Sequence, residues 1–189
     1  MKLRVKFIFA CLFICATPVL AAGQCEALRS TDAHLLKGSV KEVSFVDKRL
    51  PKGCFAAYLA KGETIYRFGI FKDGALSMVL PPTYPEADKG RSDLQEKPDL
   101  EILAVSFPDL NRDRFRDVLV YGRSIGKQYN YNFVQIYWSC TNGLIHDADA
   151  SDKVLLRTLD KEGFTKRGTH PADIERIARG GRFKSKCDE

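Results

Sequence analysis

This sequence lacks several features from which the function of a protein is commonly inferred. Its three histidines are scattered without metal-ligand spacing, and no Cys-x-x-Cys pair occurs among 189 residues. Beyond the N-terminus there is no second long apolar run that could cross a membrane. The pattern shows no βαβ alternation and no internal repeat. These absences argue against a zinc site, a transmembrane segment in the mature chain and a parallel α/β fold.

The charge balance is mild. The formal net charge is +6, and three of the cations precede an apolar segment at Phe7–Leu20 that ends in small residues. This arrangement predicts a signal peptide at residues 1–22 and a single mature domain at residues 23–189. The mature chain would carry about +3, which argues against a dedicated nucleic-acid binder. We therefore expect a periplasmic or secreted protein.

The cysteines support export. Six are present, and Cys11 and Cys15 lie in the predicted signal peptide. An even number remains in the exported chain, which predicts two disulfide bonds. Three pairings are possible, and we favour the one that ties down both ends of the domain. The favoured pairs are Cys25–Cys54 and Cys140–Cys187.

Short runs of alternating apolar residues predict a chain of β-strands. Strong hairpin turns are indicated at Asp73-Gly74 and Thr141-Asn142-Gly143. One short late helix should begin at Pro171 and end at Gly180-Gly181, whereas residues 154–159 fit either a strand or a helix. We interpret the oxygen-rich segment His146–Asp149 as a solvated turn and not as a metal site. The expected strands are residues 40–46, 54–60, 64–71, 76–80, 100–107, 115–121, 131–138 and 144–145, with a long surface loop at 81–98. This predicts a mainly β fold, an antiparallel sandwich or barrel of about eight strands with one short C-terminal helix.

An acidic loop is the most informative segment. Its positions 1, 3, 5 and 9 carry oxygen-bearing side chains, and position 7 would offer a backbone carbonyl. Because alternate residues of a curled loop point inward, this spacing gathers oxygens around one point, and Ca²⁺ takes six to eight such ligands. We predict a Ca²⁺ site formed by Asp109, Asn111, Asp113, Phe115 and Asp117.

Two metal-free alternatives remain for this loop. Position 6, where such loops usually turn through glycine, is Arg114, and a non-glycine residue there is strained by about 1 kcal/mol. Arg112, Arg114 and Arg116 also interleave with the acids and would repel a cation. The arginines and acids could form a salt-bridged turn, or the acids could serve only as turn formers.

A glycine-containing segment follows the next expected strand. Gly122 and Gly126 predict a sharp exposed turn that carries hydrogen-bond donors and an aromatic side chain. Such a loop could enter a glycosidase cleft and bind its paired carboxylates, and the Ca²⁺ loop would brace the sheet edge beside it. The predicted partner-binding residues are Arg123, Ser124, Gly126, Lys127 and Tyr129. A flexible hairpin without a partner is the alternative.

The same segment also fits a hydrolase motif. Gly122-Arg-Ser-Ile-Gly126 matches the Gly-x-Ser-x-Gly nucleophile elbow, and Asp160 and His170 follow in the order of an α/β-hydrolase triad. An elbow must run into a helix, whereas the residues after this one predict a strand. A serine hydrolase that uses Ser124 is therefore the weaker alternative, and we expect no enzymatic activity.

The stretch from Leu100 to Trp138, about a fifth of the chain, resembles a known arrangement: a strand, an Asp-x-Asn-x-Asp-x-x-x-Asp loop, a strand, a glycine-containing loop and an aromatic strand. The acidic loop resembles FG-GAP and EF-hand-like loops. Small periplasmic proteins with one such loop include carbapenem self-resistance proteins and immunity proteins against peptidoglycan-degrading effectors, some of which resemble lysozyme inhibitors.

Lysozyme inhibitors place a Ser-Gly-x-x-Tyr loop in the cleft of the enzyme. Ser124, Gly126 and Tyr129 match that loop with one extra residue, Ile125. The resemblance implies an exported, non-enzymatic protein that binds and inhibits a cell-wall hydrolase or toxin. A module that uses Ca²⁺ only as a structural brace and binds an unknown ligand is the alternative.

Overall fold

The computed structural model describes ten segments of the chain, which together contain all the predicted metal-binding and disulfide residues. These segments are residues 25–26, 28, 35–36, 38–45, 47–59, 66–81, 99–125, 130–160, 169–181 and 183–188. The predicted signal peptide, nearly all of the long loop predicted at 81–98, and three predicted partner-binding residues (Gly126, Lys127 and Tyr129) lie outside them.

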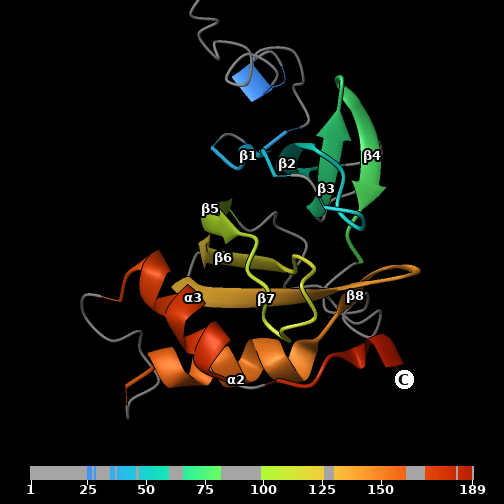
Figure 1. Ribbon diagram of the computed structural model, residues 1–189. Helices are drawn as coiled ribbons and strands as arrows, with labels where there is room; N and C mark the ends of the chain where they lie inside the picture. Colours follow the sequence, from blue (N-terminus) through green and yellow to red (C-terminus); the bar gives the residue numbers. More distant parts are fainter. Residues whose placement is uncertain are drawn as a thin grey trace, which may run out of the picture.

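Two antiparallel sheets of four strands form the centre of the molecule (Figure 1). The strands of each sheet follow one another in chain order, so each sheet is a simple meander. The first sheet consists of β1 (Lys41–Val43), β2 (Gly53–Tyr58), β3 (Arg67–Lys72) and β4 (Ala75–Val79). The second consists of β5 (Asp99–Ser106), β6 (Val118–Ile125), β7 (Asn130–Cys140) and β8 (Gly143–His146). The prediction of a mainly β, antiparallel fold of about eight strands is confirmed.

The hairpin between β3 and β4 shows why the sequence predicted it. Asp73 and Gly74 both have positive φ, 51° and 79°. Two consecutive left-handed residues match the right-handed twist of the flanking strands, and Asp-Gly adopts this conformation at little cost. The turn predicted at Thr141-Asn142-Gly143 likewise joins β7 to β8, with φ of 124° at Gly143.

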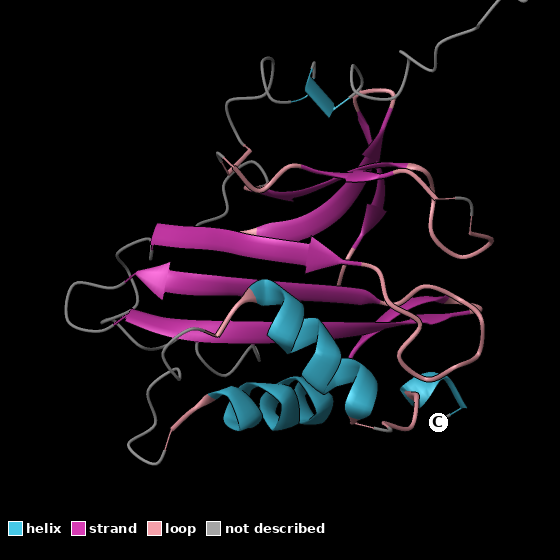
Figure 2. Cartoon of the chain, turned by 60° about the vertical axis from the view of Figure 1, so that its left-hand side comes forward, coloured by secondary structure: helices cyan, strands magenta, loops and turns pink. Residues whose placement is uncertain are grey.

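A hydrophobic core lies between the two sheets. The first sheet contributes Phe55, Phe68 and Ile70, and the second contributes Val120 and Tyr137, all of them buried. The opposite face of the second sheet is covered by the helices α2 (Ala148–Thr158) and α3 (Pro171–Gly180), as Figure 2 shows. The order of layers is therefore sheet, sheet, helices.

Helix α2 corrects two sequence interpretations. Only one helix was expected, and His146–Asp149 was interpreted as a solvated turn. Instead, Asp147 caps α2, and the helix buries Ala150, Val154 and Thr158, which recur every fourth residue on one face. Residues 154–159, which fitted either element, are thus mostly helical. No helix in the described segments is long and apolar enough to span a membrane.

Both predicted disulfides are present. Cys25–Cys54 links the N-terminal segment to β2, and Cys140–Cys187 links β7 to the short 3₁₀ helix η3 (Lys186–Asp188). The second bond closes the larger loop, with a sequence separation of 47. In the chain-entropy model a loop of this size adds about 4 kcal/mol to the free energy of unfolding.

Candidate functional site

The acidic loop joins β5 to β6, and its side chains bond to its own backbone. Oδ2 of Asp109 accepts the Arg114 N–H at 3.0 Å. Oδ1 of Asn111 accepts the Asp113 N–H at 3.2 Å, and Oδ1 of Asp113 accepts the Phe115 N–H at 2.9 Å. Three of the predicted ligands therefore point into the loop, as the spacing predicted.

The arginines of the loop point the other way. Arg112, Arg114 and Arg116 are exposed, and they alternate with the half-buried Asn111, Asp113 and Phe115. Arg112 and Arg114 have φ of 66° and 73°. The left-handed conformation predicted for Arg114 is confirmed, and Arg112 also adopts it.

Asp117 fixes the loop to the sheet. This carboxylate is fully buried; its Oδ2 accepts the Leu110 N–H at 2.9 Å, and its Oδ1 accepts the Ser139 N–H of β7 at 3.0 Å. Burial raises the pKa of Asp117 to about 6, although the two N–H donors oppose the rise and the nearby Asp113 and Asp109 add to it. The last predicted ligand is thus already engaged by backbone donors.

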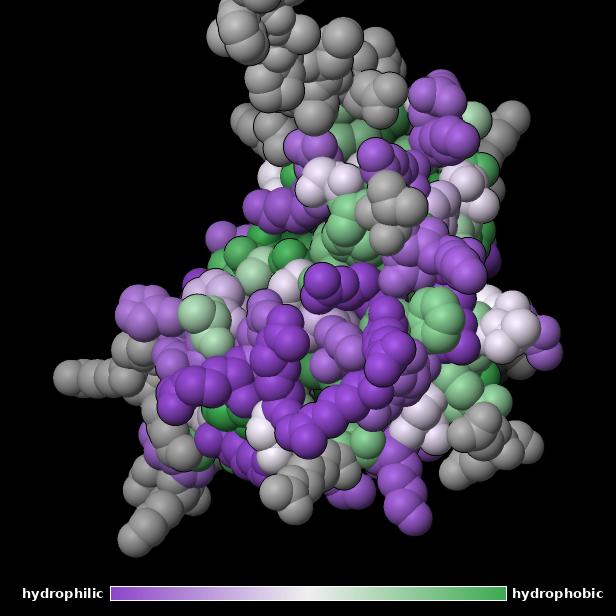
Figure 3. Space-filling view, viewed as in Figure 1, coloured by the Kyte–Doolittle hydropathy of each residue, from purple (hydrophilic) through white to green (hydrophobic). Residues whose placement is uncertain are grey.

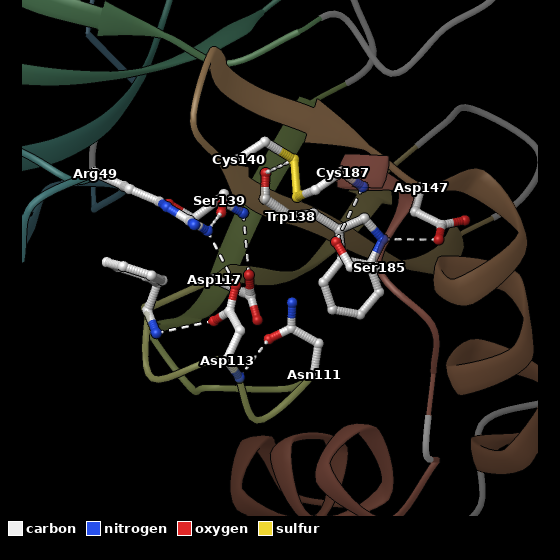
Figure 4. The surroundings of a disulfide bond; sticks show 11 residues. Arg49, Asn111, Asp113, Asp117, Trp138, Ser139, Cys140, Asp147, Ser185 and Cys187 are labelled. Atoms are coloured by element: carbon white, nitrogen blue, oxygen red, sulfur yellow. Dashed lines mark hydrogen bonds and ion pairs between the residues drawn. A yellow bond between two sulfur atoms is a disulfide. The ribbon is translucent and has the colours of Figure 1, made fainter. Parts of the chain in front are cut away.

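Arg49, which sequence analysis missed, connects this loop to the first sheet (Figure 4). Its Nη1 donates to Oδ2 of Asp113 at 2.9 Å and to the Ser139 carbonyl. Its guanidinium lies over the Phe115 ring, 3.6 Å from the centroid. Asp47, two residues earlier, accepts the Arg116 N–H at 2.9 Å. Arg49 and Asp47 belong to the connection between β1 and β2 and could not be linked to the loop by local pattern.

The described residues contain no group of three or more His, Cys, Asp or Glu side chains arranged to hold a metal ion. One oxygen in the loop nevertheless lacks a hydrogen-bond partner: Oδ1 of Asp109, which is buried. The cation that pairs with Asp113 is Arg49, from outside the loop, and not an arginine of the loop.

Comparisons with protein-family models, curated proteins and solved structures found no match for this chain.

The second predicted site differs from expectation. Gly122, Arg123 and Ser124 belong to strand β6 and not to a protruding turn. Ser124 is 1% exposed, because alternate residues of a strand share a face and Ser124 shares the inner face of Val118 and Val120. A direct contact between the Ser124 hydroxyl and a partner is therefore excluded in this conformation.

Gly122 was predicted to permit a turn, but in the structure it permits close packing between strands. A Cβ at this position would lie 2.3 Å from the Phe133 ring and 2.7 Å from the Glu101 carbonyl oxygen. A glycine inside a strand often marks such a close approach. The signal that looked like a flexible turn is thus a requirement of the β5–β6–β7 packing.

The hydrolase alternative lacks its geometry. β6 continues into β7, so Ser124 is followed by a strand where a nucleophile elbow needs a helix. The Ser124 Oγ has no hydrogen-bond partner in the described part of the chain, and His170 is the N-cap of α3. The structure does not bring these residues together as a nucleophile and its base.

The two predicted sites lie at opposite ends of the second sheet. In the β5–β6 register, Ser106 pairs with Leu119 beside the acidic loop, and Asp99 pairs with Ile125 beside the 126–129 connection. The expectation that the acidic loop braces the edge next to the glycine-containing turn is therefore wrong. What the acidic loop braces is the contact between the two sheets.

A second buried carboxylate organises the helical side. Asp147 Oδ1 accepts the Ala150 N–H at 3.0 Å, and its Oδ2 accepts the Trp138 Nε1–H at 2.8 Å. The Lys186 ammonium lies 3.5 Å from Oδ1, and Lys186 precedes Cys187 of the Cys140–Cys187 bond, which Figure 4 shows near Trp138 and Asp147. Burial opposes ionisation, but the hydrogen bonds and Lys186 together keep the pKa of Asp147 below its usual value.

Proposed function

We propose that this chain is an exported, non-enzymatic protein that binds and inhibits a partner protein of the peptidoglycan-hydrolase or toxin class. The observation that supports this most is the end of β6, called the hairpin tip here and defined by Arg123 and Ile125. Arg123 and Ile125 are exposed on the strand face opposite to Ser124, and Ile125 is 38% exposed. Rigid β-strands thus carry a cation and an apolar side chain to the end of the sheet.

The chemistry of the hairpin tip suits an acidic cleft. Arg123 is only loosely held, with its Nη1 3.8 Å from Glu101 Oε2 and its Nε 3.5 Å from Asn132 Oδ1. Its guanidinium is therefore available for the stronger, charge-assisted bonds that paired carboxylates offer. Such pairs occupy the clefts of glycosidases, including those that cut cell walls. Lys127 and Tyr129 belong to the proposed surface and lie outside the described residues.

The hairpin tip predicts a specific mutational result. We expect Arg123→Ala/Ile125→Ala to weaken inhibition of a susceptible peptidoglycan hydrolase about thirtyfold, the equivalent of about 2 kcal/mol for a hot-spot contact. Inhibition would be measured as the clearing rate of purified peptidoglycan, across a panel of purified hydrolases.

Ser124→Ala is the matched control, because its buried hydroxyl has no hydrogen-bond partner in the described chain and cannot reach a partner protein. We expect it to inhibit like the wild type. If the double variant retained full inhibition, the contact surface would lie elsewhere. If the wild-type protein inhibited no hydrolase of the panel, the proposed function itself would fail.

We also propose that the acidic loop holds Ca²⁺ as a brace, through the side chains of Asp109, Asn111, Asp113 and Asp117 and the carbonyl of Phe115. The buried, unmatched Oδ1 of Asp109 supports this fit, because an orphaned carboxylate oxygen is costly and a cation would satisfy it. Ca²⁺ would supply positive charge to the inward oxygens. Arg49 already supplies part of that charge at Asp113, so the two cations should compete.

This competition gives the test of the metal proposal. We expect Arg49→Gln to bind Ca²⁺ about fivefold more tightly than wild type, since a half-buried ion pair of about 1 kcal/mol no longer has to be broken. Isothermal titration calorimetry would measure both affinities, and Asp113→Ala should abolish the heat. Equal heats in wild type and Asp113→Ala would show that the loop is a metal-free turn. Ca²⁺ binding without any hydrolase inhibition would favour the alternative of a purely structural calcium module.

A further inference from the structure

Two arginines of the acidic loop adopt a conformation that disfavours arginine. Arg112 and Arg114 lie in the left-handed region, with φ of 66° and 73°. Glycine and asparagine adopt this region more readily, whereas other side chains are strained there. Such strain is retained where the surrounding structure imposes it, and it concentrates at functional positions.

Within the described segments, no interaction of the Arg112 or Arg114 side chain compensates for this backbone strain. Neither Arg112 nor Arg114 has an ion pair or a side-chain hydrogen bond within the described segments; the one bond at these positions is the Arg114 backbone N–H to Asp109. The nearby acids are already engaged: Asp113 pairs with Arg49, and Asp47 caps backbone N–H groups. Two exposed guanidinium groups therefore remain without a partner in this part of the protein.

Arg116 behaves differently and marks the edge of this surface. Its Nη1 donates to the Phe107 carbonyl at 3.3 Å, and its guanidinium lies 5.8 Å from the Phe45 ring centroid. Lys48 is also exposed, next to Asp47, whose Oδ2 binds the Arg116 backbone. In Figure 3 hydrophilic side chains dominate the middle of the face, where Figure 1 draws the acidic loop in yellow-green.

We propose that the outer face of the acidic loop, made of Arg112 and Arg114 and flanked by Arg116 and Lys48, is a docking surface for an acidic patch on a folded protein. The guanidinium group binds carboxylates through two parallel hydrogen bonds, and it is enriched at the energetic centres of protein interfaces. The internal hydrogen bonds of the loop hold both arginine backbones in place before binding, which lowers the entropic cost. This surface is independent of the hairpin tip, since it lies at the other end of β6.

A membrane surface fits these residues less well. Basic clusters that recognise anionic lipid contain four to eight Lys or Arg residues, so this surface, with four, lies at the lower limit, and firmer binding adds an apolar side chain that inserts among the lipids. The aromatic residue of this loop, Phe115, is half-buried and covered by the Arg49 guanidinium. The docking surface thus offers directional donors without an apolar anchor.

The test separates docking from folding, because glycine should relieve the strain while it removes the contact. Arg112→Gly/Arg114→Gly should unfold at an equal or higher urea concentration than the wild type, yet bind fluorescent poly-L-glutamate at least tenfold more weakly. Lys72→Gln/Lys153→Gln removes two exposed charges from other elements and should change the binding less than twofold.

Each other outcome would overturn the proposal. A lower urea midpoint for the glycine variant would show that the arginines stabilise the fold. An equal loss of affinity for poly-L-glutamate in both double variants would show that binding depends only on net charge. Arginine-dependent binding to phosphatidylglycerol vesicles, with none to poly-L-glutamate, would identify a lipid surface. Hydrolase inhibition by the glycine variant tests the hairpin tip and not the docking surface. Failure of the proposed inhibitory function can therefore be distinguished from failure of the docking proposal.

Discussion

Replacing Asp117 by alanine should lower the free energy of unfolding by about 3 kcal/mol, because two buried backbone N–H groups would lose their acceptor at once and each costs about 1–3 kcal/mol. These donors belong to Leu110 in the loop and Ser139 in β7, and Asp117 itself is fully buried. Urea denaturation at pH 5 without added Ca²⁺ would measure the loss. A change below 1 kcal/mol would mean that water replaces the carboxylate and that the loop is not anchored through Asp117.

The pH dependence of this effect has a defined sign. Burial raises the pKa of Asp117 to about 6 in the folded protein, above its ordinary value of 3.8. The folded state therefore keeps the proton longer than the unfolded state, and stability falls as the pH rises from about 4 to about 6. The shift corresponds to roughly 3 kcal/mol.

Asp117→Asn is the matched control, because it keeps the side-chain size and does not titrate. Between pH 4 and pH 7, the free energy of unfolding of the wild type should fall by a few kcal/mol relative to that of Asp117→Asn. Urea midpoints at four pH values would measure this difference. A pH-independent difference would show that Asp117 is not protonated in the folded state at mildly acidic pH.

Local pattern predicted the strands and the disulfide pairs because each depends on neighbouring residues or on chain ends. The continuous apolar runs in β2 and β3 and the Asp73-Gly74 turn are short-range signals, and the even cysteine number needs only a count. The loop around Asp113 was predictable for the same reason, since its bonds span two to five residues.

The contacts that decide the candidate sites are long-range, and the sequence could not show them. Arg49 reaches Asp113 across 64 residues, and no local spacing links the two. Ser124 was misplaced because the glycine beside it looked like a turn signal, whereas Gly122 is required by the Phe133 ring of a neighbouring strand. Inward or outward orientation in β6 depends on register, which only the strand pairing fixes.

Asp147 was misjudged for a related reason. Its context of polar residues after a strand is typical of a solvated turn, and the same composition is typical of a helix N-cap. The deciding signal was the buried face of the following helix, where Ala150 and Val154 pack against the second sheet. A four-residue repeat of small and apolar residues beyond Asp147 could have indicated the helix.

Replacing Asp147 by alanine should therefore cost about 3 kcal/mol of stability. The N-cap contributes about 1 kcal/mol, and the buried Trp138 Nε1–H would lose its partner at about 1–3 kcal/mol. Both groups bond to the Asp147 carboxylate, at 3.0 Å from the Ala150 nitrogen and 2.8 Å from the Trp138 nitrogen. Trp138 is the only tryptophan, so its fluorescence during urea unfolding reports directly on this site.

Two further variants divide this loss into its parts. Asp147→Asn should retain the helix cap, because asparagine caps as well as aspartate, and should lose about half as much stability as the alanine variant. Trp138→Phe removes the donor, and a double-mutant cycle with Asp147→Asn, followed by circular dichroism because the Trp138→Phe variants lack tryptophan, isolates the buried hydrogen bond. A coupling energy near zero would show that the two side chains act independently. In that case Asp147 would stabilise the protein through the α2 cap and the Lys186 ion pair, and not through Trp138.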